Sequence, residues 1–498
     1  RVIDVLKDNL DADLLNQGGL NIHTSLKIQF QKFAIQAMYQ GLIDISNRQK
    51  RPIQPLGRVS QLELAQIITR SLIQNSHDEY FLTLQVNYWK TKNFQNLFFT
   101  EKNPVYPIYA LVSSVNHNEI SVFLGKNKEG RVTIDENSVS LRKLSVGDIV
   151  SVIILEENSD FFHIRVVPQI KTQSAFISLD PTTFAINTYL GGIANNRGDF
   201  DRAYSAKRQL GSSFKPFVYG AGLESGALTV ITPCDDIPVV ITDPWTGKRW
   251  KPMNYTNTFS GTISVKRALA YSINTCAVKV LEQIGIDKVI SFAQRLGISS
   301  HIPKNLTAAL GTSQISLIEA VNAYSVWANQ KGNFEPVSFI KSVLSSDHQE
   351  VLTIQKTSRQ IFSYEVAYII NYLLQSVVES GTAQKALSLN RQSAGKTGTT
   401  NNTIDAWYIG YTPQILAGVW VGNDDNTSLG EGETGGRAAL PIWIYYMKKI
   451  LPYFPAVTFE PPPNIVYSQI RNLSYGHISK GNDLEGIYEP FIAGTEPK

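Results

Sequence analysis

Hydrophobic positions repeat at helical spacing near the start of the chain. The apolar residues recur every three or four positions, at Leu26, Ile28, Phe30, Phe33, Ala34, Ala37 and Met38. A second helix is predicted from about Ser60 to Ile73, and Ser60 followed by Glu63 indicates a capping box at its start. Residues 1–75 are therefore expected to be mostly helical.

The pattern changes between residues 104 and 168 to short β-rich runs. The predicted strands are Ile108–Val115, Glu119–Leu124, Arg131–Ile134, Ile149–Leu155 and Phe161–Val166. Alternating apolar positions such as Ile108, Ala110 and Val112 indicate that these strands bury a core of their own. Five short strands predict a small OB-like barrel, and such barrels often bind oligonucleotides or oligosaccharides. A spacer or docking domain is the interpretation that we favour.

From about Ser174, strands, helices and strands follow one another. A hairpin is predicted at Ala175–Leu179 and Ala185–Leu190. Helical runs follow at 212–224, 264–284, 286–297, 316–329 and 364–379, and strand-like runs at 405–411 and 415–422. This order predicts an α+β domain with a helical insert. The tail beyond Pro461–Pro463 is expected to be irregular.

The pattern divides the chain into four parts. They are a linker region with helices (1–103), the OB-like insert (104–168), the α+β domain (169–460) and a C-terminal tail (461–498). A length of 498 residues is consistent with two to four domains, and 43% hydrophobic with 18% charged residues indicates a globular protein. The net charge of +4 does not support nucleic-acid binding.

Cysteine content and hydropathy add little more. Cys234 and Cys276 leave one disulfide possible, but Cys276 lies in an apolar helical run and we expect both thiols to be free. The sequence contains no run of 18 apolar residues, so no membrane span is predicted within it. The chain begins at Arg1 without Met, so we expect that an N-terminal piece is missing.

The first candidate motif is Gly211-Ser212-Ser213-Phe214-Lys215, at the start of a predicted helix. A serine and a lysine three positions later lie on one face of a helix. A neutral lysine can remove the serine proton where burial or a second cation lowers its pKa. Taken alone, an N-capped helix with a solvated lysine explains this motif better.

The second motif is Ser272-Ile273-Asn274 within an otherwise apolar run. Serine and asparagine compete with the backbone for hydrogen bonds, so they predict a turn between two helices with polar groups directed at a target. A plain turn between helices is the alternative.

The third motif is Lys396-Thr397-Gly398-Thr399-Thr400. Gly398 lets a substrate backbone approach closely, and lysine with threonine hydroxyls can bind a carboxylate. Gly395-Lys396-Thr397 also matches the end of a Walker A loop, but that loop needs a glycine at the position of Asn390. The phosphate-binding interpretation therefore fails.

Together the three motifs, in this order, match the pattern of penicillin-binding proteins and class A β-lactamases. The surrounding segments Lys207–Phe217, Asp405–Pro413 and Gly418–Gly422 extend the match. Residues 174–460 closely resemble the transpeptidase domain of a bifunctional class A penicillin-binding protein. More weakly, Gly18–Leu26 resembles the linker after the family's glycosyltransferase domain. The 104–168 segment resembles the OB-like insert of the penicillin-binding protein 1A branch.

The resemblance implies a penicillin-binding-protein/serine β-lactamase-like fold and a role for each motif residue. Ser212 would be the nucleophile and Lys215 its base. Ser272 would relay a proton to the leaving amine, Asn274 would hold the peptide amide, and Lys396 would keep the local potential positive. Thr397, Gly398 and Thr399 would bind the substrate, and the backbone N–H groups of Ser212 and Thr399 would form the oxyanion hole. No cofactor or metal is implied.

The implied activity is a peptidoglycan D,D-transpeptidase that acts on stem peptides ending in D-Ala-D-Ala and is inhibited by β-lactams. The implied location is outside the cytoplasmic membrane, in the periplasm. The barrel could bind other cell-wall synthesis proteins, and the membrane would be reached only through a missing N-terminal anchor. The family's glycosyltransferase domain has no counterpart in this sequence, so glycan polymerisation is not predicted. A D,D-carboxypeptidase, a β-lactamase and a non-catalytic scaffold stay open as alternatives, although a β-lactamase needs only one domain.

Overall fold

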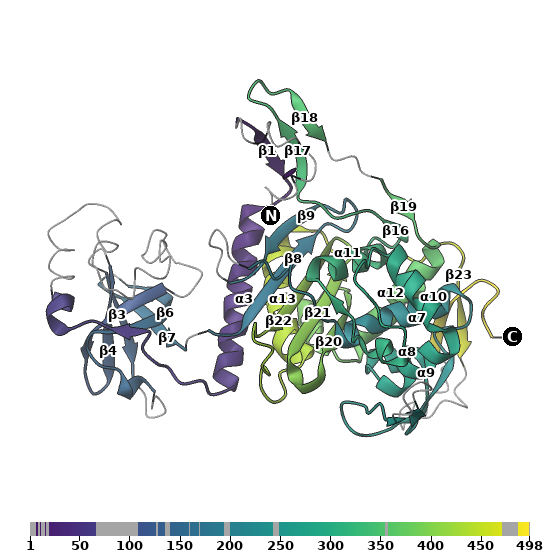
Figure 1. Ribbon diagram of the computed structural model, residues 1–498, viewed down its shortest axis with the longest axis horizontal. Coiled ribbons are helices and arrows are strands. Elements are labelled where there is room, and N and C mark those ends of the chain that lie inside the picture. Colours follow the sequence, from purple (N-terminus) through teal and green to yellow (C-terminus); the bar gives the residue numbers. More distant parts are fainter. Residues whose placement is uncertain are drawn as a thin grey trace. The chain divides into compact units, whose positions relative to one another are not determined.

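The computed structural model describes residues 19–65, 108–125, 128–134, 140–158, 160–168, 170–193, 200–242, 249–353, 357–470 and 487–497, with a few residues before Gly19. These residues form two compact units. One comprises the described residues within 1–34, 174–193 and 200–498, and the other comprises those within 35–173. Figure 1 shows their elements. Within the described residues, none of the helices combines the length and apolar character needed to cross a bilayer.

The larger unit is built on a five-stranded sheet. Its strand order is β20 (Ala394–Thr399), β21 (Asp405–Thr412), β22 (Ile415–Gly422), β8 (Gln173–Leu179) and β9 (Ile186–Leu190). Every residue of β21 and β22 is buried, which requires helices on both faces of the sheet.

Two helices cover the opposite faces of this sheet (Figure 1). On one face, α11 (Leu317–Ala328) packs so closely that a Cβ on Gly418 would meet the side chain of Val321. On the other face, Trp443 of α13 (Gly435–Ile450) packs against Tyr408 with 5.1 Å between ring centroids. Helix α13 was not predicted, because Gly435, Gly436 and Pro441 are all residues that interrupt helices.

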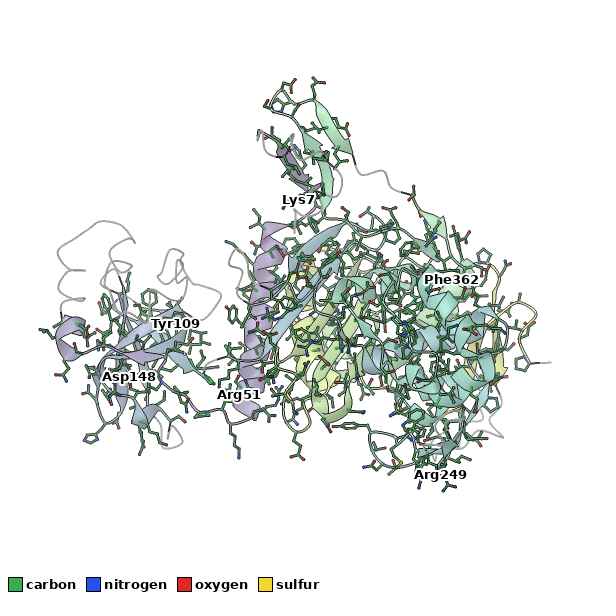
Figure 2. The ribbon with its side chains drawn as sticks, in the orientation of Figure 1. Lys7, Arg51, Tyr109, Asp148, Arg249 and Phe362 are labelled. Carbon is green, nitrogen blue, oxygen red and sulfur yellow. A yellow bond between two sulfur atoms is a disulfide. The ribbon has the colours of Figure 1, made fainter. Side chains whose placement is uncertain are left out.

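The helical insert lies beside β20. Its helices are α7 (Lys215–Glu224), α8 (Val265–Ala270), α9 (Asn274–Ile284), α10 (Ile286–Arg295), α11 and α12 (Tyr364–Glu379). An aromatic cluster of Phe217, Tyr324 and Trp327 fills the interior, and Phe362 (Figure 2) stacks on Phe292. The α+β prediction is confirmed.

Short elements complete the larger unit. Paired strands are β1 (Asn21–Thr24) with β17 (Ile340–Leu344), β17 with β18 (Glu350–Thr353), β10 (Arg208–Gln209) with β15 (Gln314–Ile315), β11 (Pro233–Asp236) with β14 (Gly261–Ser264), β12 (Ile241–Thr242) with β13 (Arg249–Trp250), and β16 (Asn333–Phe334) with β19 (Arg359–Gln360). Short 3₁₀ helices are η2 (Gly211–Phe214), η3 (Leu306–Leu310), η4 (Gln384–Leu389), η5 (Asn401–Thr403) and η6 (Leu451–Tyr453).

Two sequence-based expectations are corrected in this unit. The C-terminal tail forms a hairpin of β23 (Ile465–Ile470) and β24 (Ile487–Ile492) rather than irregular chain. The hairpin is held by an ion pair of 2.8 Å between Glu489 and Lys266 of α8. Cys234 and Cys276 are not free but form a disulfide, because β11 and the start of α9 bring their Cα atoms to 5.7 Å.

The smaller unit contains a closed β-barrel. Its strands are β3 (Ile108–Val115), β4 (Glu119–Gly125), β5 (Lys128–Thr133), β6 (Asp148–Glu157) and β7 (Phe162–Val167). Pairing runs β6-β3-β4-β5-β7 and returns to β6, with β5 and β7 parallel and a 3₁₀ turn η1 (Leu141–Lys143) before β6. The predicted OB-like barrel is confirmed, and Ile108, Ala110 and Val112 lie in its core.

A segment before the barrel packs on its outside. The short strand β2 (Gly57–Arg58) pairs with β6, and Arg58 forms an ion pair of 2.5 Å with the buried Asp148. Asp148 is labelled in Figure 2. Ser60 and Glu63 form the predicted capping box. The rest of the helix predicted to Ile73 lies outside the described residues, whereas the predicted N-terminal helix is present as α3 (Ile28–Arg48).

Candidate active site

Ser212 lies on a tight turn pressed against the edge strand of the large sheet. It belongs to η2, immediately before α7, and is only partly buried. Gly211 before it has φ +58°, and a Cβ at that position would lie 2.6 Å from the carbonyl oxygen of Thr399. Only glycine fits this approach, and it sets Ser212 directly beside β20.

Lys215, one turn after Ser212, is completely buried. Its Nζ contacts the backbone oxygen of Ser272 at 2.5 Å, Oδ1 of Asn274 at 2.7 Å and Oγ of Ser272 at 3.2 Å. The first two atoms can only accept hydrogen bonds. A neutral amine satisfies both of them with its two hydrogens and keeps a lone pair that can accept a proton.

Two physical effects favour that neutral form. The pKa of Lys215 is lowered well below its ordinary value, mainly by burial and to a smaller extent by the positive charge of Lys396. Lys396 is also completely buried, and burial lowers its pKa to about 7. Burial thus favours the neutral form of both lysines, and the charge of Lys396 favours the neutral form of Lys215 further.

The second motif forms the predicted turn between two helices. Ser272 has φ +58° and lies between the end of α8 and the start of α9. This left-handed conformation turns both the backbone oxygen and the hydroxyl of Ser272 toward Lys215. Asn274 uses its Oδ1 for Lys215 and donates from Nδ2 to the backbone oxygen of Met253 at 2.7 Å.

The third motif occupies β20, where its polar side chains already have partners. Thr397 Oγ1 pairs with Thr382 Oγ1 at 2.7 Å, and Thr399 Oγ1 accepts a hydrogen bond from the backbone N–H of Gly435 at 3.0 Å. A Cβ on Gly398 would lie 2.5 Å from the backbone oxygen of Leu210, so this glycine lets the Ser212 turn approach the strand.

The motif residues meet at one cleft with a volume of about 1240 Å³. Ser212, Ser272, Asn274, Thr397 and Thr399 line the cleft. Lys215 and Lys396 are completely buried. The structure thus brings all three motifs together, although they are far apart in the sequence. A serine hydroxyl on the wall of a cleft, with an amine base one helical turn away, is suited to nucleophilic acyl transfer.

Sequence reasoning missed several residues of this site. Thr382 follows α12 and reaches Thr397, and Asn254 lies in a loop that also lines the cleft. Tyr324 of α11 donates its hydroxyl to the backbone oxygen of Ser213 at 2.7 Å. None of them lies in a recognisable motif, and their contacts depend on the fold.

Comparison with known proteins gives a family for this region. Residues 174–442, more than half of the chain, match the family model described as the penicillin binding protein transpeptidase domain. Penicillin-binding protein 1A of Pseudomonas aeruginosa is 33% identical over 430 residues, which cover 72% of this chain and 52% of that protein. Penicillin-binding protein 1A of Aquifex aeolicus is 28% identical over 99% of this chain and 62% of its own length. The chain therefore spans little more than half the length of these curated relatives.

Solved structures agree on the fold. The crystal structure of penicillin-binding protein 1A from Haemophilus influenzae superposes with a TM-score of 0.81 at 24% identity, over 100% of this chain and 76% of that one. PonA1 from Mycobacterium tuberculosis gives a TM-score of 0.52 at 27% identity, over 59% of this chain and 84% of that one. A structure of PonA1 in complex with penicillin V gives a TM-score of 0.58 at 21% identity, over 92% of this chain and 94% of that one.

Proposed function

The chain belongs to the penicillin-binding protein transpeptidase family, and we propose that it is a serine-type D,D-transpeptidase that cross-links peptidoglycan. Its substrates are stem peptides that end in D-Ala-D-Ala. The observation that carries the proposal is the buried amine of Lys215. It lies one turn after Ser212 and is held by the second motif, and its pKa is lowered first by burial and then by the charge of Lys396 of the third motif.

The reaction begins at Ser212. Its Oγ attacks the carbonyl carbon of the penultimate D-Ala while the neutral Lys215 amine accepts the hydroxyl proton. The tetrahedral intermediate collapses, the peptide bond breaks, and terminal D-Ala leaves as an amine that receives a proton through Ser272. The amine of a second stem peptide then attacks the acyl-enzyme, forms the cross-link and releases Ser212.

Groups around the serine stabilise this chemistry. The backbone N–H groups of Ser212 and Thr399 form the oxyanion hole, where one lost donor costs roughly 3–4 kcal/mol in acyl-transfer enzymes. The hydroxyls of Thr397 and Thr399 and the charge of Lys396 bind the terminal carboxylate. Gly398 admits the substrate backbone, and Asn274 holds the peptide amide with the second hydrogen of its Nδ2.

A β-lactam presents a strained amide to the same serine, so it acylates Ser212 and blocks the enzyme. Peptidoglycan is cross-linked outside the cytoplasmic membrane, so the protein works in the periplasm. The barrel binds other cell-wall synthesis proteins.

A D,D-carboxypeptidase would use the same acyl-enzyme with water as the acceptor. A non-catalytic scaffold would not need a buried amine at Lys215, and burying such a group destabilises the fold.

Labelling with a fluorescent penicillin tests the assignment of the nucleophile. We expect covalent label on the parent protein and on Ser213→Ala, the variant of the neighbouring serine. Ser212→Ala should keep the fold, as judged by circular dichroism, and take up no label. Label on Ser212→Ala at the parental rate would contradict the proposal, and an unlabelled parent would favour the scaffold.

A second assay separates the transpeptidase from the carboxypeptidase. The protein is incubated with a pentapeptide donor ending in D-Ala-D-Ala and a stem-peptide amine as acceptor, and the products are identified by mass spectrometry. We expect the cross-linked dimer to exceed the hydrolysed tetrapeptide at millimolar acceptor. Hydrolysis alone at every acceptor concentration would assign the carboxypeptidase.

A further inference from the structure

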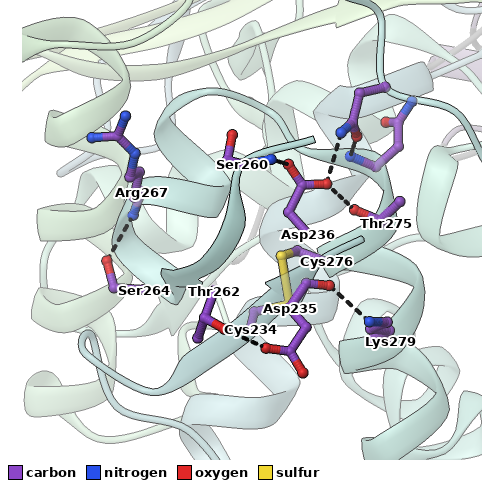
Figure 3. The surroundings of a disulfide bond; sticks show 12 residues. Cys234, Asp235, Asp236, Ser260, Thr262, Ser264, Arg267, Thr275, Cys276 and Lys279 are labelled. Atoms are coloured by element: carbon purple, nitrogen blue, oxygen red, sulfur yellow. Dashed lines mark hydrogen bonds between the residues drawn. A yellow bond between two sulfur atoms is a disulfide. The ribbon is translucent and has the colours of Figure 1, made fainter. Parts of the chain in front are cut away.

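A buried carboxylate lies next to the active site but belongs to none of the three motifs. Asp236, the last residue of β11, is completely buried. Its Oδ1 accepts hydrogen bonds from Asn254 Nδ2 at 2.7 Å and Thr275 Oγ1 at 2.5 Å, and its Oδ2 accepts the backbone N–H of Ser260 at 2.8 Å. Figure 3 shows the contacts to Thr275 and Ser260. Every partner is a donor, as an ionised carboxylate requires.

Asn254 connects this carboxylate to the second motif. While its Nδ2 donates to Asp236, its Oδ1 accepts the backbone N–H of Asn274 at 2.9 Å. That N–H is the first of α9 and has no partner within the helix. The residue in the N-cap position, Ile273, has no side chain that could cap it. Asn254 thus caps α9 from a distant loop, and Asp236 holds the cap in place.

Consecutive residues at the start of α9 are all fixed by the same neighbours. Asn274 is bonded to Asn254, Thr275 to Asp236, and Cys276 to Cys234, two residues before Asp236. Figure 3 shows the disulfide directly beside Asp236 and Thr275. The rotation and depth of the first turn of α9 are therefore set by β11 and the Asn254 loop.

This turn carries the side chain that holds the Lys215 amine. Asn274 Oδ1 lies 2.7 Å from Nζ of Lys215, and Asn274 Nδ2 is fixed by Met253, the residue before Asn254. A shift of the turn therefore moves an acceptor of Lys215. A buried carboxylate seldom stabilises a fold more than an apolar residue of similar size would. Its presence here therefore indicates a role in holding the polar groups around it.

We propose that Asp236 and Asn254 are positioning residues that set Asn274, and through it Lys215, for acylation of Ser212. This inference rests on the proposed function. Asp236 touches none of the reacting groups and does not line the cleft, so its effect reaches the reaction only through Asn254 and the start of α9.

The test compares two neighbouring carboxylates. Asp236→Asn replaces one carboxylate oxygen by an NH2 donor, which then faces either the backbone N–H of Ser260 or the side-chain donors of Asn254 and Thr275. Asp235→Asn is the matched control, since Asp235 is exposed and, among the described residues, its carboxylate accepts a hydrogen bond from Thr262 alone. Stopped-flow acylation by a fluorescent penicillin gives the acylation constant k2 and the dissociation constant of the non-covalent complex separately.

We expect Asp236→Asn to lower k2 by at least about tenfold with the dissociation constant little changed, because small misplacements of catalytic groups are costly. Asp235→Asn should match the parent. In an Asn274→Ala background, Asp236→Asn should cost little more, since the link through which it acts has been removed.

A parental k2 in Asp236→Asn would overturn the inference, as would an equal loss of k2 in both backgrounds. If Asp236→Asn does not fold, Asn254→Ala decides, with the same expected fall in k2 and the same contradicting result. Failure of the parent to become acylated would instead contradict the proposed function, so the two failures are distinguishable.

Discussion

Lys396 shows what a single buried charge costs the folded protein. Its side chain is completely inaccessible and its pKa is about 7, against an ordinary value of 10.5. Between these pH values the unfolded state binds a proton that the folded state does not, so stability rises with pH across this window. Below pH 7 the protonated Lys396 lowers the free energy of unfolding by the full amount, on the order of 5 kcal/mol. Above pH 10.5 Lys396 is neutral in both states, and this destabilisation is absent.

We therefore expect Lys396→Met to be more stable than the parent at pH 7 and acylated more slowly. The difference in the free energy of unfolding between the two proteins should become smaller as pH rises from 7 toward 10.5. Over this range the buried Lys396 of the parent ceases to be a charged group that destabilises the fold, whereas the methionine variant has no such group. Urea unfolding at several pH values measures the difference, with Lys385→Met as a control at an exposed lysine. A difference that does not change with pH would show that Lys396 is not a buried titrating group.

At this scale the sequence predicts the motif residues but not the contacts that arrange them. Spacing placed Lys215 on the same helix face as Ser212, and the turn at Ser272 was expected from its polar side chains. The partners Thr382 and Asn254 could not be predicted, because they are brought to the site by loops whose path depends on the whole fold. The catalytic roles of the motif residues stay predictions until they are tested.

At the scale of elements, the disulfide joins β11 to α9 and closes a loop with a sequence separation of 42 residues. Pairing across such a loop is invisible to local patterns, which is why a free Cys276 in an apolar helix was the wrong prediction. Helix α13 was missed for a different reason. Packing of Trp443 and its neighbours against the sheet overrides the two glycines and the proline that disfavour helix.

Removing the disulfide should destabilise the unit that contains the active site. For a loop of this size, we expect Cys234→Ala/Cys276→Ala to lower the free energy of unfolding by about 4 kcal/mol, since the unfolded chain gains conformational freedom. Urea unfolding followed by tryptophan fluorescence measures the change. The parent treated with dithiothreitol should behave like the variant, and unfolding curves that coincide with the untreated parent would contradict this prediction.

At the scale of the whole molecule, the smaller unit buries hydrophobic clusters of its own. The barrel core consists of strand residues together with Ile134, Leu141 and Leu144, and Ile53 packs against it. A second small cluster contains Val59, Leu64, Leu111, Phe123 and Ile149. Residues 53–64 therefore pack with the barrel in the same unit. All three motifs lie in the other unit.

We expect that replacing residues 53–168 with a short Gly/Ser bridge leaves penicillin acylation nearly intact. The deletion removes both hydrophobic clusters together, so it exposes neither of them. Acylation rate and thermal midpoint of the deletion are compared with those of the parent. A folded deletion that no longer reacts with penicillin would show that the barrel shapes the active site.

Closure of the barrel restricts how another protein can recognise it. Each of its five described strands has a neighbour on both sides, since β6 and β7 pair to complete the ring. An open sheet offers unpaired backbone groups onto which a foreign strand can add, and onto which identical chains can aggregate. The described strands of this barrel offer only short unpaired rows, along the seam where β5 and β7 pair at Gly130–Phe162 and Arg131–His163. We therefore expect a partner to recognise side chains on the faces or loops of the barrel, so that its binding responds to single surface substitutions, and we expect little edge-to-edge association at high local concentration.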